Sequence, residues 1–456
     1  MMTNHTLTYS KKKVFHYPIT DRLQVTVHEE SNPFGIDLNQ LFNMAARINK
    51  NRSFLFVSKV LGKHIPVEPQ RALDTGALLA ALYQEHLLGI KHPSYSDWVQ
   101  SVAQHLPTQA TTGASQTVLP QSHLFIGFAE TATALGHAVF ENFQNAHYIH
   151  STREVLESVR PTFEFQEEHS HATDQICYGK RELFENNDPI VLVDDEITTG
   201  KTALNIIEAL QEAYPRTEYT VLSILDWRTK KHRQQFKELE QRLGIRVRVL
   251  SLVSGTIEVN GDPDLTPVKE EVPSIQPEAD VRTLKVKPIF PYQSTEYTQS
   301  ITTSGDVKER SYLSYSGRFG LSSDEQFLLE GAIKRLGTYL SMVRKGKSTL
   351  CLGTGEFMYI PMKAASHMGN DVCYQSTTRS PIHAITREGY AVQNAYQYPS
   401  PEDASISHYV YNIPYKQYDE IFVFLEHGSR GECYEPLIDE LKKTGASVIY
   451  LVDFSS

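Results

Sequence analysis

The chain has 456 residues, with 44 basic and 54 acidic side chains and a formal net charge of −10 at pH 7. That length allows two or three domains, each with its own core, while the negative charge disfavours binding along a nucleic-acid backbone. No run approaches the roughly 18 apolar residues of a membrane span, residues 1–15 lack the apolar region of a signal peptide, and the cysteines form no Cys-x-x-Cys pair, so we expect a cytoplasmic protein without a zinc site or a disulfide framework.

Residues 1–117 are expected to form an N-terminal extension, or hood, over the domain that follows. A helical pattern runs through Leu38, Leu41, Phe42 and Ala45, and residues 54–60 form an apolar run typical of a strand. We predict that the hood covers one edge of the next domain's sheet and completes a ligand pocket there. Basic side chains around this run could reach a ligand or point outward from an edge strand. They are Arg52, Lys59, Lys63 and His64.

Residues 118–259 alternate apolar strand-like runs with helical patterns. Strands are expected near residues 123–126, 148–150, 189–193 and 220–225. This alternation predicts an α/β fold in which a parallel sheet carries helices on both faces.

The insert at residues 158–181 is long for a connection between two strands. It contains a polar stretch in which His169 and His171 fall on one face if the chain is extended. These histidines could bind phosphate, act as acid or base, or ligate a metal. The alternative is a solvent-facing loop, since a single His-x-His pattern has low specificity.

Residues 190–203 carry the most informative motif of the chain. They read Ile-Val-Leu-Val-Asp-Asp-Glu-Ile-Thr-Thr-Gly-Lys-Thr-Ala, so an apolar strand runs into two carboxylates and then into a turn that opens a helix. Asp194 and Asp195 can accept hydrogen bonds from vicinal ribose hydroxyls, and Gly200 permits close backbone approach to a phosphate at the helix N-terminus. A P-loop is excluded, because Asp195 stands where that motif requires glycine. The turn residues predicted to hold the phosphate are Thr198, Thr199, Gly200, Lys201 and Thr202.

Residues 260–306 are rich in Pro, Glu, Ser and Thr, which predicts a linker. Residues 307–456 again alternate strand-like and helical patterns, which predicts a second α/β domain.

The second domain repeats spacings of the first. In both, a glycine after an apolar strand precedes a glutamate by three residues and an arginine by 26 residues (153 − 127 and 379 − 353). Several matches in the same order favour a duplicated strand-loop-helix core. The matched positions are Gly127, Glu130, Arg153, Asp195 and Gly200 in the first domain and Gly353, Glu356, Arg379, Glu426 and Gly431 in the second.

The second copy has diverged at its predicted ligand loop. Leu425 stands where the first copy has Asp194, so ordinary phosphosugar binding is expected to be lost. We predict instead a cleft for an anionic ligand, and the alternative is a silent domain that only packs against the first. The candidate residues of this second site are Glu356, Arg379, Glu426 and Arg430.

Residues 190–202 resemble the PRPP-binding motif of type I phosphoribosyltransferases, in which an apolar strand is followed by two acidic residues and a Thr-x-Gly-x-Thr-like turn. Most of residues 30–456 resemble the two-domain phosphoribosyltransferases encoded with bacterial tellurite- and stress-resistance clusters. That wider resemblance also rests on residues 54–64 and on Glu167-Glu-His-Ser-His171. It rests further on Thr378-Arg379-Ser380-Pro381, which matches the motif of the family's C-terminal TRSP domain.

The resemblance implies a Mg²⁺-dependent transfer of ribose 5-phosphate from PRPP to a nucleobase-like acceptor, in either direction, within the synthesis of a nucleoside-like metabolite. Asp194 and Asp195 would favour the oxocarbenium-like state, and His169 and His171 would lie on a lid. Mg²⁺ would arrive with PRPP, since the sequence shows no dedicated metal cage. The turn implied to hold the departing pyrophosphate consists of Ala129, Glu130, Thr131, Ala132 and Thr133.

Two other classes of function stay open. A PRPP-sensing regulator would keep the phosphate turn without turnover, but it would normally add a nucleic-acid-binding module. A PRPP-synthetase-like pyrophosphokinase would need an ATP site. Neither addition is recognisable in the sequence, which also leaves open the acceptor, the direction of reaction and any homo-oligomer.

Overall fold

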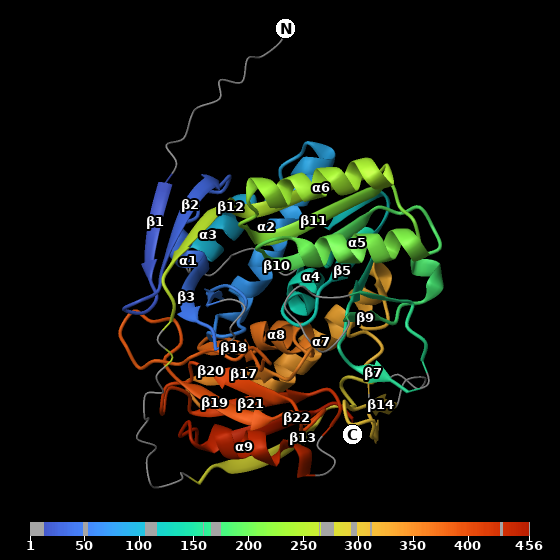
Figure 1. Ribbon diagram of the computed structural model, residues 1–456. Coiled ribbons are helices and arrows are strands. Elements are labelled where there is room, and N and C mark those ends of the chain that lie inside the picture. The colour runs from blue at the N-terminus through green and yellow to red at the C-terminus, as the bar shows by residue number, and fades with distance from the viewer. Residues whose placement is uncertain are drawn as a thin grey trace.

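Figure 1 shows two α/β units stacked on each other in the computed structural model of the chain. The structure describes residues 13–48, 53–104, 116–157, 159–165, 175–263, 265, 278–292, 299–310, 312–428 and 432–455. Among these residues, no helix is long and apolar enough to cross a membrane.

The first unit is built around the larger sheet, with strand order β1-β2-β12-β11-β10-β5-β6-β16. Its centre is parallel, as predicted, and consists of β12 (Arg246–Asn260), β11 (Glu218–Asp226), β10 (Ile190–Ile197), β5 (Thr117–Gly127) and β6 (Phe143–His150). Antiparallel strands extend both edges: β1 (Lys13–Pro18) and β2 (Gln24–Ser31) beside β12, and β16 (Leu321–Ser322) beside β6.

Helices cover both faces of this sheet, as predicted, because alternate strand residues pack to opposite sides. Ile190 and Leu192 pack with α5 (Lys201–Ala213) and α6 (Lys230–Leu243). Val191 and Val193 belong to the cluster that contains the apolar residues of α2 (Pro69–Leu88) and α4 (Ala132–Phe140). α3 (Tyr95–Gln104) packs against α2.

The hood differs from the helical prediction for residues 38–45. Only α1 (Leu38–Leu41) is helical, and the chain then becomes β3 (Phe42–Ala46), which pairs antiparallel with β4 (Phe54–Ser58). The cause is tertiary: pairing with β4 buries Phe42, Met44 and Ala45, of which only Phe42 and Ala45 also fit helical spacing.

The predicted linker at residues 260–306 also contains ordered strands. β13 (Asp280–Lys285) pairs with β22 at the edge of the second sheet, and β14 (Gln299–Ile301) pairs with β15 (Val307–Glu309) and β7 (Val155–Leu156). The side chains of β13 are almost all exposed, so main-chain hydrogen bonds rather than apolar burial hold it. The polar composition of this segment therefore predicted a linker and gave no indication of the edge strand.

The second unit carries the parallel sheet β13-β22-β21-β17-β18. Its other strands are β22 (Val448–Asp453), β21 (Glu420–Leu425), β17 (Thr349–Gly353) and β18 (Val372–Ser376), with β19 (Ala395–Pro399) and β20 (Ser407–Tyr411) as a separate pair. The helices are α7 (Ser323–Val343), α8 (Tyr359–Ser366) and α9 (Glu435–Lys442). Short 3-10 turns lie at Arg181–Leu183 and Glu432–Tyr434.

The order β22-β21-β17-β18 repeats the order β11-β10-β5-β6 of the first unit. Gly127 lies opposite Val193 and Gly353 opposite Phe424, which is the register that the repeat predicts. The edges differ, since β12 follows β11 in the chain whereas β13 precedes β22. The duplication accounts for the four shared strands but not for these edges, and it stays a prediction.

The two units share one apolar core. α8 packs against α2 and α4, and the main chains of Val67 and Tyr374 bond in both directions (2.9 and 2.7 Å). A single cluster of buried apolar residues runs from the first unit into the second. The units are therefore fixed against each other.

Candidate functional site

The predicted phosphosugar turn forms where β10 passes into α5. Asp194 and Asp195 are half-buried, and the Asp195 main-chain N–H donates to the Asp194 carboxylate (2.9 Å). Gly200 has a φ of 82°, and a Cβ there would lie 2.6 Å from the Phe236 ring, so both the backbone and the packing require glycine.

The N-cap residue of the helix that follows this turn is a glycine, which offers no side-chain acceptor. Gly200 occupies the N-cap position of α5, and its carbonyl accepts from Leu204 N (3.0 Å). The Thr199 hydroxyl accepts from Lys201 N (3.2 Å), while no side chain caps α5 from Gly200. The first N–H groups of a helix need acceptors, and here a phosphate can supply them.

Beside this turn, the hood closes over a hollow at the carboxyl ends of β10 and β11. The hollow spans about 260 Å³, including space open to solvent. Trp227 is 1% exposed and stacks on Phe56 (5.4 Å between centroids), so it supports the wall of the hollow from behind. The lining residues are Leu41, Phe56, Ser58, Leu61, Asp195, Glu196, Ile224 and Leu225.

The turn implied to hold pyrophosphate lies between β5 and α4 and is entirely buried. It folds back tightly, since a Cβ on Gly127 would lie 2.4 Å from the Ala132 carbonyl oxygen. Lys63 of the hood donates to the Thr131 hydroxyl, and its ammonium lies 4.0 Å from the Glu130 carboxylate. Of the hood's basic candidates within the described residues, Lys63 is therefore the one placed at this turn, while Arg52 lies outside those residues.

A reciprocal pair of glutamate contacts joins the two units. Glu130 of the first unit accepts from the Thr378 hydroxyl (2.8 Å) and from Arg379 N (3.2 Å). Glu356 of the second unit accepts in the same way from the Thr152 hydroxyl (2.6 Å) and from Arg153 N (2.9 Å). Each unit's Gly-x-x-Glu loop thus holds the other unit's Thr-Arg turn. The repeat pointed to these residue pairs, but nothing in the sequence indicated the crosswise pairing.

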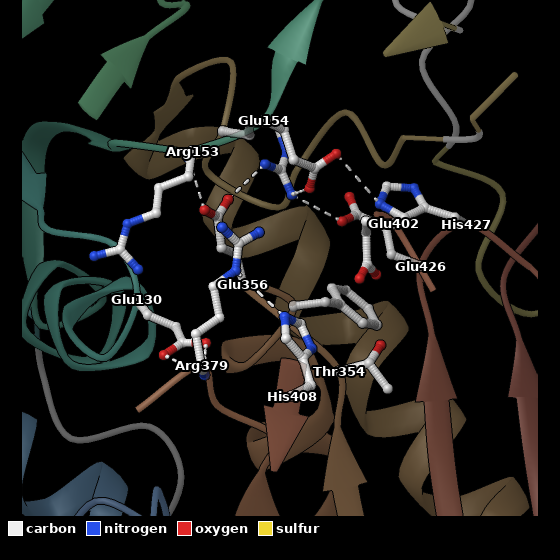
Figure 2. A pocket seen from close by; sticks show the side chains of 13 residues that line it. Glu130, Arg153, Glu154, Thr354, Glu356, Arg379, Glu402, His408, Glu426 and His427 are labelled. Atoms are coloured by element: carbon white, nitrogen blue, oxygen red, sulfur yellow. Dashed lines mark hydrogen bonds and ion pairs between the residues drawn. The ribbon is translucent and has the colours of Figure 1, made fainter. Parts of the chain in front are cut away.

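These contacts surround a pocket between the units, shown in Figure 2, that spans about 400 Å³, including space open to solvent. Glu356, Arg379 and Glu426 line it together, as the second-site prediction required. The pocket is shared, however, because Glu130, Arg153 and Glu154 of the first unit also line it. The second-site prediction named residues of the second unit, and the structure adds these residues of the first.

Arg318 lies at the centre of this pocket's charge network, and sequence reasoning missed it. Its side chain is 1% exposed and bonds to Glu356 (2.7 Å), Glu426 (3.1 Å), Glu154 (3.2 Å) and the Thr152 hydroxyl (2.6 Å). Burial alone would lower the pKa of Arg318, but the three carboxylates outweigh it and raise the pKa well above its ordinary value. Two of the predicted second-site carboxylates are therefore already paired with a buried cation.

Other pKa shifts follow from this network. Burial alone would raise the pKa of Glu154, but Arg318 and then His427 hold it well below its ordinary value. Burial alone would lower the pKa of His427, yet the Glu154 carboxylate, whose nearest oxygen is 3.6 Å away, raises it overall. His408 is 1% exposed, and burial lowers its pKa.

Three of the predicted site residues, His169, His171 and Arg430, lie outside the described residues. The ordered strands β8 (Phe163–Phe165) and β9 (Gln175–Cys177) pair antiparallel on either side of residues 166–174. In the described part of the chain, no group of three or more His, Cys, Asp or Glu side chains is placed to hold a metal ion.

Two protein families match the chain. Residues 41–256 match the family described as phosphoribosyl transferase, and residues 315–441 match the TRSP domain that lies C-terminal to it. No curated protein matches the chain.

Several solved structures are similar at low identity. Adenine phosphoribosyl transferase from Trypanosoma brucei, in complex with AMP, pyrophosphate and ribose-5-phosphate, is 14% identical, with 50% of this chain and 82% of that chain covered and a TM-score of 0.32. The adenine enzyme from Saccharomyces cerevisiae is 11% identical, with 47% and 96% covered and a TM-score of 0.27. Orotate phosphoribosyltransferase from Aeropyrum pernix is 17% identical, with 46% and 83% covered and a TM-score of 0.24.

Proposed function

We propose that this chain, which belongs to the phosphoribosyl transferase family and carries a TRSP domain after its transferase domain, moves ribose 5-phosphate between PRPP and a nucleobase-like acceptor. The observation that carries the proposal is the turn from β10 to α5. It combines two half-buried carboxylates, a glycine that the fold requires and a helix whose N-cap residue offers no side-chain acceptor. Ligands of open α/β sheets bind at this carboxyl edge.

Different parts of the turn would bind different groups of PRPP. Main-chain N–H groups of residues 198–202 would bind the 5′-phosphate, and Asp194 and Asp195 would bind the ribose hydroxyls. The same carboxylates would stabilise the positive charge that develops on the ribose ring as pyrophosphate departs. The adjoining hollow, with apolar walls and the carboxylates of Asp195 and Glu196, would take the acceptor base.

The buried turn after β5 would hold the pyrophosphate. The main-chain N–H groups of Glu130 and Thr131 have no acceptor among the described residues, and Lys63 adds a positive charge beside them. The carboxylate oxygens of Asp194 and Asp195 are hard donors that suit a Mg²⁺ ion delivered with PRPP. Such an ion neutralises the leaving group. His169 and His171 remain candidate lid residues.

Because of the sequence resemblance, we extend the proposal to the pathway in which the reaction takes place. The product would be a nucleoside-like metabolite of a cytoplasmic pathway linked to tellurite resistance and stress. The acceptor and the direction of the reaction are open.

Calorimetry with Mg-PRPP tests the site. Replacing both Asp194 and Asp195 by Asn should weaken binding by at least about tenfold, because hydrogen bonds to charged groups contribute roughly 1.5–3 kcal/mol each. The matched control is Glu208→Gln with Glu212→Gln, which removes the same charge from exposed positions of α5. Equal affinity in wild type and the aspartate variant would refute the assignment.

A screen of bases with labelled PRPP then tests turnover. Release of pyrophosphate should require one acceptor class. If PRPP binds but no base supports release, the PRPP-sensing regulator becomes the better description.

A further inference from the structure

The TRSP domain places one arginine directly against the transferase domain's pyrophosphate turn. The main-chain N–H of Arg379 and the hydroxyl of Thr378 both donate to the Glu130 carboxylate, which is 7% exposed. Hydrogen bonds to a buried carboxylate are strong and fix geometry. The main chain that carries the Arg379 side chain is therefore hydrogen-bonded to the turn itself.

Protein contacts orient the guanidinium of Arg379 but leave its terminal NH₂ groups available for hydrogen bonds. Its Nε donates to Nε2 of His408 (3.3 Å), which can accept because burial keeps this imidazole neutral at pH 7. Its two terminal NH₂ groups have no partner among the described residues, although Arg379 lines the pocket of Figure 2. A planar fork held in this way matches two oxygens of a phosphate.

The carboxylates around the pocket are paired elsewhere. Arg318 pairs with Glu154, Glu356 and Glu426, and Lys63 lies 4.0 Å from Glu130. The remaining one, Glu402, accepts from the Ser400 hydroxyl (2.6 Å). No ion pair joins the Arg379 side chain to a carboxylate in the described part of the chain, so its charge is available to a ligand.

We propose that Arg379 of the TRSP domain binds the pyrophosphate group of PRPP, opposite the main-chain N–H groups of residues 130–131, so that both domains build one active site. This inference rests on the proposed function and assigns a role to the TRSP domain. Arg153 lines the same pocket from the transferase side. With this assignment, the TRSP domain acts through Arg379. The loop that corresponds to the phosphate turn in its sequence repeat then needs no ligand of its own.

Side-chain variants of Arg379 test this directly, because the contact with Glu130 uses the main chain and survives substitution. Arg379→Gln should weaken binding of Mg-PRPP and of Mg-pyrophosphate by about tenfold to a hundredfold, the amount expected for one charged bidentate contact. Arg379→Lys should recover part of the loss. Ribose 5-phosphate, which lacks the pyrophosphate, should bind all variants equally. Arg335→Gln, at an exposed position of α7, is the control.

The outcomes separate this inference from the proposed function. If wild type binds neither PRPP nor ribose 5-phosphate, the proposed function fails. If wild type binds both and Arg379→Gln keeps wild-type affinity for pyrophosphate, only the role of Arg379 is overturned.

An experiment on the unaltered chain covers the case in which Arg379 variants do not fold. Phenylglyoxal modifies accessible arginines, and modified positions can be found by mass spectrometry. Mg-pyrophosphate should protect Arg379 and leave Arg335 reactive. Equal modification of Arg379 with and without pyrophosphate would overturn the inference.

Discussion

Replacing Arg318 by methionine removes the cation that the two domains share while keeping a side chain of similar length. Three buried carboxylates, on Glu154, Glu356 and Glu426, then lose the cation that they share. Breaking a buried ion pair from one side is costly, because the remaining charge stays desolvated. We therefore expect this substitution to destabilise the chain far more than the loss of an exposed arginine.

The magnitude can be worked out from the size of the chain. Removing one partner of a buried pair costs about 3–5 kcal/mol. Unfolding entropy is about 2.1 cal/mol/K per residue, so the 456 residues give about 1 kcal/mol/K when they unfold together. The melting temperature of Arg318→Met should therefore fall by about 3–5 °C at pH 7.5.

The loss should also depend on pH. In wild type the pKa of Glu154 is held below its ordinary value of 4.5, so its contribution to stability is present above that value and disappears as the pH falls through the lowered pKa. Without Arg318, the largest interaction that opposes burial is lost, so the pKa of Glu154 rises and this carboxyl takes up its proton at a higher pH than in wild type. The gap between variant and wild type should therefore narrow towards pH 5.

Circular dichroism melts at pH 5.0, 6.0 and 7.5 measure both effects. Arg335→Met is the control, because an exposed arginine on α7 should change stability by no more than about 0.5 kcal/mol. A fall of less than 1 °C at pH 7.5, or a gap that stays constant down to pH 5, would refute the role given to Arg318.

Three further predictions concern the site and its surroundings. Gly200→Ala forces a Cβ to 2.6 Å from the Phe236 ring at a φ of 82°, so it should lower stability by about 1–3 kcal/mol and weaken PRPP binding. Thermal melting and calorimetry measure these effects, and unchanged values would contradict the requirement for glycine in the turn. His427→Gln should cost more stability at pH 6 than at pH 9. Protonated His427 beside Glu154 stabilises the fold below about pH 6.5, and this contribution is lost as the pH rises through the raised pKa of His427. An equal loss of stability at both pH values would speak against the pairing. Removing Mg²⁺ with EDTA should abolish pyrophosphate release without shifting the melting temperature, and a lowered melting temperature would instead indicate a structural ion.

Local sequence was sufficient for the phosphosugar turn. The apolar strand, the two carboxylates, Gly200 and the start of α5 are contiguous, so their relative geometry depends mainly on neighbouring backbone angles. The alternation of strands and helices likewise predicted the parallel sheet and its covered faces, which the strand pairing confirms. Repeat spacing singled out the loops that end β5 and β17.

Elsewhere tertiary pairing overrode the local pattern. The helical spacing of Leu38, Leu41 and Ala45 gave way to a hairpin, because β4 offered Phe42 and its neighbours a partner strand. The polar stretch of β13 became an edge strand, since an edge needs main-chain hydrogen bonds and little apolar surface.

Only the folded chain decided how the two domains meet. Glu130 and Thr378 are 248 residues apart, and Arg318 joins Glu154 to Glu426 across both domains. Contacts of that span leave no periodicity in sequence, because they depend on how two finished units pack rather than on any local preference. The sequence thus determined the parallel centres of the two sheets and the turn between β10 and α5, while the packing of the units alone brought Arg379 to the turn after β5.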